Sequence, residues 1–191
     1  MSCLIRTAAN PLPLDRREES SSKSLVILGR SSKASTTLWA RLLHKRENPL
    51  LPEDPLERAA ARSWAKFGDD KVLPSIWESF TNEGKEQEEA IVEAKENLKY
   101  LEEEQKGKKF FGGEKLGFAD IALGWLAHYE SVFEDVAGMK LLTEEEFPLL
   151  SAWKLTFADA PIIKDNWPSR DKLVAKFQAT REDQLLKKAP K

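Results

Sequence analysis

The feature that most constrains the fold is a change of sequence pattern at Asn48-Pro49. After this point, apolar residues recur at three- and four-residue steps, which is the spacing of one face of an α-helix. Before it, the chain is rich in Ser, Arg and Pro and shows no sustained period. The charge changes too, because residues 1–50 hold nine Lys and Arg against four Asp and Glu, and the remainder holds 21 against 28. We therefore expect a helical domain over residues 48–187 and an irregular segment over residues 1–47.

Five helices are expected after the change of pattern, and the absence of strand alternation there predicts an all-α fold. Pro74 is expected to kink the first helix, because proline lacks a backbone donor and clashes with the preceding turn. The third helix is apolar nearly all round, which is typical of the central helix of a bundle. The Gly112-Gly113 pair before it is interpreted as a turn. The expected helices span roughly residues 56–80, 85–106, 118–134, 147–159 and 169–186.

Composition excludes several classes of protein. A net charge of -2 disfavours a general nucleic-acid binder. No run approaches roughly 18 apolar residues, so no membrane-spanning helix is expected. One cysteine and two histidines predict no metal site and no internal disulfide, and they favour a reducing, cytosolic environment. The residues alone indicate no catalytic group and no cofactor, because phosphate-binding and nucleophile motifs are missing.

Two polar residues of the third helix are candidates for particular roles. Asp120 follows Gly117 by three residues, so its carboxylate can accept backbone N–H groups at the start of the helix, and we interpret it as a structural cap. His128 lies among apolar neighbours and is more readily explained as a core residue than as a ligand or base.

An ordered set of motifs resembles the plant tau-class glutathione S-transferases. The resemblance covers about residues 48–182 and follows the order and spacing of the family. The matching segments are residues 48–58 (NPLLPEDPLER), 61–67 (ARSWAKF), 69–77 (DDKVLPSIW), 108–114 (KKFFGGE), 116–122 (LGFADIA), 147–153 (FPLLSAW) and 170–177 (RDKLVAKF).

The resemblance implies a helical bundle like the C-terminal domain of the family, preceded by a remnant of its thioredoxin-like domain. That remnant is residues 23–28, where Ser24 matches a serine that contacts the γ-glutamyl carboxylate of glutathione, and Lys23 replaces an expected glutamate. No segment resembles the surroundings of the family's thiolate-stabilising serine. Weak glutathione binding and little turnover are therefore expected of this chain.

By position in the family pattern, five residues fall where the hydrophobic substrate pocket is lined. These are Leu73, Trp77, Phe80, Tyr129 and Phe177. The alternative interpretation of each is ordinary bundle core.

The function implied by the resemblance is conjugation of glutathione, the co-substrate, to hydrophobic electrophiles in detoxification, by a cytosolic homodimer. One alternative is a non-catalytic helical module that binds apolar ligands or a protein partner. Another is a truncated or altered gene product without a stable function.

Overall fold

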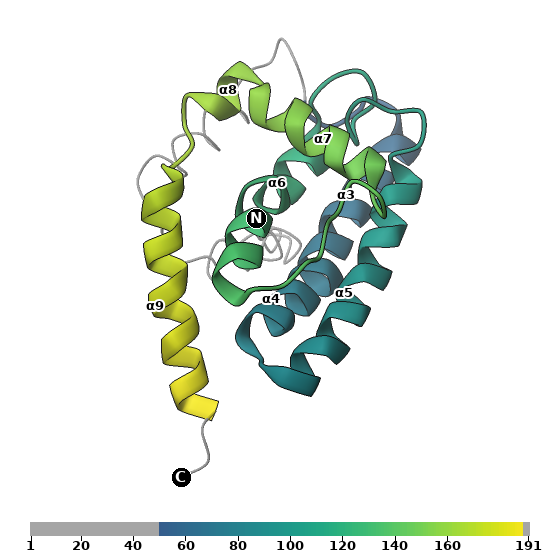
Figure 1. Ribbon diagram of the computed structural model, residues 1–191. Helices are drawn as coiled ribbons and strands as arrows, with labels where there is room; N and C mark the ends of the chain where they lie inside the picture. The colour runs from purple at the N-terminus through teal and green to yellow at the C-terminus, as the bar shows by residue number, and fades with distance from the viewer. Residues whose placement is uncertain (1–49, 189–191) are drawn as a thin grey trace, which may run out of the picture.

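The computed structural model describes residues 50–188, and every regular element in that range is helical (Figure 1). The all-α prediction is confirmed there, whereas the predicted segment 1–47, with Lys23 and Ser24, lies outside the described residues. None of the described helices is long and apolar enough to cross a membrane. The elements are α3 (Pro55–Phe67), the π-helical segment η2 (Gly68–Val72), α4 (Leu73–Thr81), α5 (Gly84–Glu104), α6 (Phe118–Ala137), α7 (Pro148–Asp159), α8 (Pro161–Lys164) and α9 (Arg170–Lys188).

The first predicted helix is continuous but changes its winding where a kink was expected. Asp54 caps α3, and its carboxylate accepts the N–H groups of Leu56 and Glu57, both at 2.9 Å. Before Pro74 the chain widens into η2, in which the Leu73 N–H donates to the carbonyl of Gly68. A widened turn at this place accommodates a proline that has no N–H of its own, without ending the helix.

Helix α6 lies at the centre of the bundle, as its apolar composition predicts, and packs against α3, α4, α7 and α9. Two glycines let neighbouring elements approach closely. A Cβ on Gly68 would lie 2.4 Å from Leu123 of α6, and a Cβ on Gly124 would lie 2.5 Å from the ring of Phe157 on α7.

In Figure 1, α7 and α8 lie across the top of the bundle and α9 runs down its left side. Helix α7 ends because Ala160 is extended (φ −60°, ψ 126°), the conformation that a following proline favours. Pro161 then begins the short helix α8, which the sequence pattern did not predict. Helix α9 is joined to the end of α4 by Arg181, whose Nε donates to the carbonyl of Phe80 at 2.9 Å.

Candidate functional site

The side chains predicted to line a pocket come from α4, α6 and α9 and gather around Phe133. The ring centroid of Phe133 lies 4.6 Å from Phe80, 4.8 Å from Phe177, 6.2 Å from Trp77 and 6.4 Å from Tyr129. We call these five residues the aromatic cluster. Leu73 belongs to the same buried core, one helical turn before Trp77.

Helical spacing explains why the cluster forms. Leu73, Trp77 and Phe80 are four and three residues apart and share one face of α4. Tyr129 and Phe133 are four residues apart on α6.

Helix α9, which carries Phe177, is held in place one turn further along by Arg181. This side chain donates to the carbonyls of Phe80 and Asn82 at 2.9 and 3.4 Å. Its guanidinium also lies 3.2 Å from the carboxylate of Glu83. A cation at the C-terminal end of α4 satisfies carbonyls that have no partner within the helix and complements the helix dipole.

Burial divides the predicted pocket residues into two groups. Leu73, Phe80 and Phe177 are at most 1% exposed, as core residues are. Trp77 and Tyr129 are half-buried and form the accessible edge of the cluster. Burial also raises the pKa of Tyr129, so its hydroxyl stays protonated at neutral pH and can donate a hydrogen bond. A ligand that reaches the cluster without rearranging it meets these two side chains first.

Asp120 is fully buried and accepts four hydrogen bonds. Its Oδ2 accepts the N–H groups of Gly117 at 2.9 Å and Gly112 at 3.0 Å. Its Oδ1 accepts the N–H of Phe111 and the indole N–H of Trp153, both at 2.8 Å. Burial raises the pKa of this carboxyl, and the four hydrogen bonds oppose that rise.

Only the bond to Gly117 belongs to the start of α6, where the sequence placed the contacts of Asp120. The other three join α6 to the 108–117 loop and to α7. The carboxylate therefore links the start of α6, the preceding loop and α7, and all its hydrogen-bond partners are backbone amides or a buried indole.

His128 is half-buried, and its ring makes an edge contact with Trp167, with centroids 4.2 Å apart. Burial lowers the pKa of His128 to about 3, so the ring is neutral at physiological pH. The part of the chain that the structure describes contains no group of three His, Cys, Asp or Glu side chains able to hold a metal ion.

A shallow apolar groove of about 270 Å³ lies elsewhere, between α3 and α5, and no sequence pattern predicted it. Ser63, Trp64, Phe67 and Tyr100 line it. The part of this groove that α3 contributes could have been predicted, because Trp64 and Phe67 are three residues apart on one apolar face. Tyr100, which is 61% exposed, sits in a helix whose other faces are crowded with charge, and no pattern singled it out.

The helical bundle described above is the fold of a glutathione S-transferase C-terminal domain. Residues 64–161 match the family model described as "Glutathione S-transferase, C-terminal domain", so the chain belongs to this family.

Among known proteins, the chain is 46% identical over 138 residues to Glutathione transferase GST 23 of Zea mays, covering 72% of this chain and 62% of that protein. It is 41% identical over 135 residues to Glutathione S-transferase U8 of Arabidopsis thaliana, covering 71% and 60%. The chain thus spans about three fifths of the length of these relatives.

Two solved structures share the fold. The tau-class enzyme of mango, Mangifera indica, superposes with a TM-score of 0.62 at 38% identity, covering 68% of this chain and 62% of that one. A rice enzyme solved in complex with glutathione gives 0.63 at 28% identity, covering 80% and 71%. The resemblance to the tau class is confirmed.

Proposed function

We propose that this chain supplies the hydrophobic-substrate side of a tau-class glutathione S-transferase, with the aromatic cluster receiving the electrophile. One observation carries the proposal. Helices α4 and α6 bring the half-buried Trp77 and Tyr129 to the edge of an otherwise buried aromatic cluster. A planar, electron-poor ring can pack against these two side chains in the offset and edge-to-face arrangements that aromatic groups prefer.

The conjugation itself needs the thiolate of glutathione, which attacks the electrophilic carbon and forms a carbon–sulfur bond, while a leaving group such as chloride departs with the electron pair of the bond that breaks. A hydrogen bond to the sulfur favours the thiolate by lowering its pKa. The family's thiolate-stabilising serine has no match in the sequence. The aromatic cluster cannot replace it, so we propose that groups outside the cluster determine whether the chain catalyses conjugation. Ser24 is the proposed contact to the γ-glutamyl carboxylate, and Lys23 opposes the glutathione ammonium.

Two further properties belong to the proposal. The family expectation is a homodimer, which sedimentation of the purified chain at several concentrations would test. The expected place of action is the cytosol, in keeping with a sequence that has one cysteine.

Calorimetric titration with 1,3-dinitrobenzene, an unreactive aromatic of the right polarity, tests the role of the cluster. Trp77→Ala is expected to weaken binding about tenfold or more, because one aromatic contact is worth roughly 1 kcal/mol beyond its buried area. The matched control is Trp64→Ala, a half-buried tryptophan of α3 in the other groove, which should change affinity less than twofold. Equal affinity of wild type and Trp77→Ala would overturn the proposal.

A second candidate function is a non-catalytic module that binds apolar ligands in the α3–α5 groove. The exposed Tyr100 and the apolar lining of that groove favour it. The same titration separates the two functions, because the second predicts that Trp64→Ala, and not Trp77→Ala, abolishes binding.

A further inference from the structure

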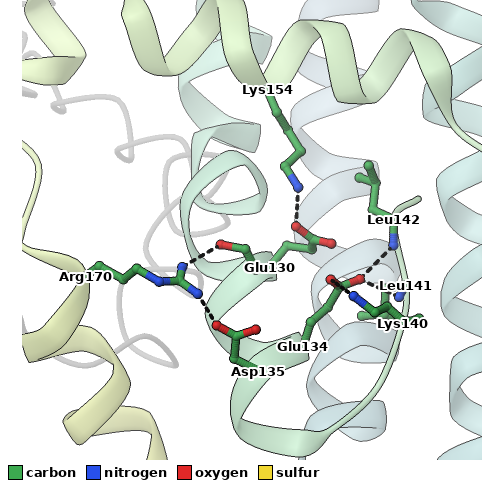
Figure 2. A network of polar contacts seen from close by, with 9 residues as sticks. Glu130, Glu134, Asp135, Lys140, Leu141, Leu142, Lys154 and Arg170 are labelled. Atoms are coloured by element: carbon green, nitrogen blue, oxygen red, sulfur yellow. Dashed lines mark hydrogen bonds and ion pairs between the residues drawn. The ribbon is translucent and has the colours of Figure 1, made fainter. Parts of the chain in front are cut away.

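Helix α6 carries two carboxyl side chains one turn apart in the interior of the bundle (Figure 2). The side chain of Glu130 is 1% exposed and that of Glu134 is 12% exposed. Residues four apart on a helix are neighbours, and two like charges at this spacing repel. Water screens that repulsion poorly at a buried site.

The partners of the two carboxyls differ (Figure 2). Oε2 of Glu130 pairs with Lys154, which reaches in from α7, while its buried Oε1 has no hydrogen-bond partner among the described residues. Oε1 of Glu134 accepts the backbone N–H groups of Leu141 and Leu142 at 2.6 and 3.1 Å. Glu134 therefore fixes the backbone at Leu141 and Leu142 in the segment 138–147, which joins α6 to α7 and is also anchored by its buried apolar side chains.

The surrounding charges are few. Lys140 lies 3.9 Å from Glu134 but is 79% exposed, so water screens it. Arg170 of α9 donates a hydrogen bond to Ser131. It also pairs with Asp135 on a neighbouring side of α6 (Figure 2). Among the described residues, the ionisable groups that act on Glu130 are Lys154 from α7 and Glu134 from its own helix.

Lys154 thus pairs with Glu130, Glu134 has the exposed Lys140 as its cation, and the buried Oε1 of Glu130 accepts no hydrogen bond from the described residues. A proton on Oε1 of Glu130 has two effects. It removes one of the two negative charges, and it turns the unpaired oxygen into a donor that can bond the Glu134 carboxylate. Burial raises the pKa of Glu130 to about 7, Lys154 opposes the rise, and Glu134 adds to it.

We propose that Glu130 is a proton-operated latch for the segment 138–147. Protonated Glu130 donates a hydrogen bond to Glu134 and keeps that carboxylate on the amides of Leu141 and Leu142. Deprotonated Glu130 repels Glu134, and opening of the segment relieves the repulsion. The latch lies next to Tyr129 and Phe133 of the aromatic cluster, but it does not depend on the proposed function.

The direction of the pH effect follows from linkage. A carboxyl whose pKa is higher in the closed form than in the open form keeps its proton longer when closed, so raising the pH favours opening. Burial is the largest cause of the raised pKa, so the full effect requires that opening also brings Glu130 into water. With a closed value of about 7 and the ordinary value of 4.5 in such an open form, the opening equilibrium rises by up to about tenfold between pH 6 and pH 8. Below about pH 4.5 both forms are protonated and the dependence disappears.

Amide hydrogen exchange at Leu141 and Leu142, corrected for the intrinsic pH dependence of exchange, measures the opening. Wild type should lose protection by up to about tenfold between pH 6 and pH 8. Glu130→Gln cannot titrate and keeps a donor toward Glu134, so its protection should be independent of pH. Lys154→Met removes the cation that lowers the pKa, so the loss of protection should move to higher pH.

The matched control is Asp135→Asn, a change from acid to amide on the same helix at a side chain that is 62% exposed. It should leave the wild-type pH dependence intact. A ¹³C titration of the Glu130 carboxyl in the unmodified chain provides a readout that does not depend on the variants folding. A midpoint near 7 supports the latch. A midpoint near 4.5, or the same pH dependence in Glu130→Gln as in wild type, would overturn it.

Discussion

Replacing Asp120 by alanine removes the acceptor of four hydrogen bonds at once. The donors at Phe111, Gly117 and Trp153 are buried and would be left without a partner, whereas Gly112 lies at the surface and can turn to water. A lost hydrogen bond to a charged group costs about 1.5–3 kcal/mol, and the terms do not add fully. Removing a buried carboxylate also recovers part of its desolvation cost, which is the effect that raises its pKa.

We expect Asp120→Ala to lose about 3–5 kcal/mol of unfolding free energy, and roughly 10–15 °C of melting temperature. A cap that contacted only the first turn of a helix would contribute about 0.5–2 kcal/mol. Urea denaturation followed by far-ultraviolet circular dichroism measures the difference. The control is Asp159→Ala, whose side chain is 81% exposed and should change stability by less than about 0.5 kcal/mol.

A double-mutant cycle with Trp153→Phe isolates the bond that reaches α7. The coupling energy between Asp120 and Trp153 should be about 1–2 kcal/mol, because the indole N–H donates directly to the carboxylate at 2.8 Å. A loss below about 1 kcal/mol in Asp120→Ala, or no coupling to Trp153, would refute this account. Unchanged stability with altered ligand binding would reassign Asp120 to a binding site.

Three further outcomes follow from the structure. Gly124→Ala should destabilise the bundle by about 1–3 kcal/mol in urea denaturation, although alanine favours helices, because the new Cβ would lie 2.5 Å from Phe157. The surface variant Glu93→Ala on α5 is its control, and a stabilised Gly124→Ala would contradict the packing argument. Arg181→Ala should cost about 1–3 kcal/mol and Arg181→Lys less, since lysine keeps the charge but not the fork that reaches two carbonyls; equal losses would show that the charge alone contributes nothing. The purified chain should bind glutathione weakly or not at all and conjugate a chloronitrobenzene barely above the uncatalysed rate, because the sequence has no match to the thiolate-stabilising serine; ordinary turnover in the same assay would show an unrecognised site.

The helices were predictable where apolar spacing alone determines them. The apolar pattern placed α5 and α9 within a few residues of their observed ends, and the residue before Pro161 ends α7 as proline geometry requires. The widened winding of η2 was not predictable, because a proline can bend, end or rewind a helix depending on what packs against it. Helix α8 is a single turn, which is too short to show a period.

Polar contacts, too, were predictable only where the two residues are close in the sequence. The bond from Asp120 to Gly117 spans three residues and could be inferred from the spacing, but its bond to Trp153 spans 33 residues and depends on tertiary packing. Glu130 and Lys154 come together only because α7 crosses α6, and in the sequence Glu130 is one acidic residue among many. The family pattern singled out Trp77, Phe80, Tyr129 and Phe177, whose rings lie around Phe133 in the fold. Their burial could only be seen in the structure, and their role in a pocket stays a prediction.

The central claim is that the accessible edge of the aromatic cluster receives the hydrophobic ligand. Two-dimensional NMR of the ¹⁵N-labelled chain, titrated with 1,3-dinitrobenzene, tests it directly, because each tryptophan indole N–H gives its own signal. Single tryptophan-to-phenylalanine variants assign the signals. We predict saturable shifts that are largest at the indole of Trp77, with the indole of Trp64 unaffected. Shifts confined to Trp64 and its neighbours in the α3–α5 groove, or no saturable shift at Trp77, would contradict the claim.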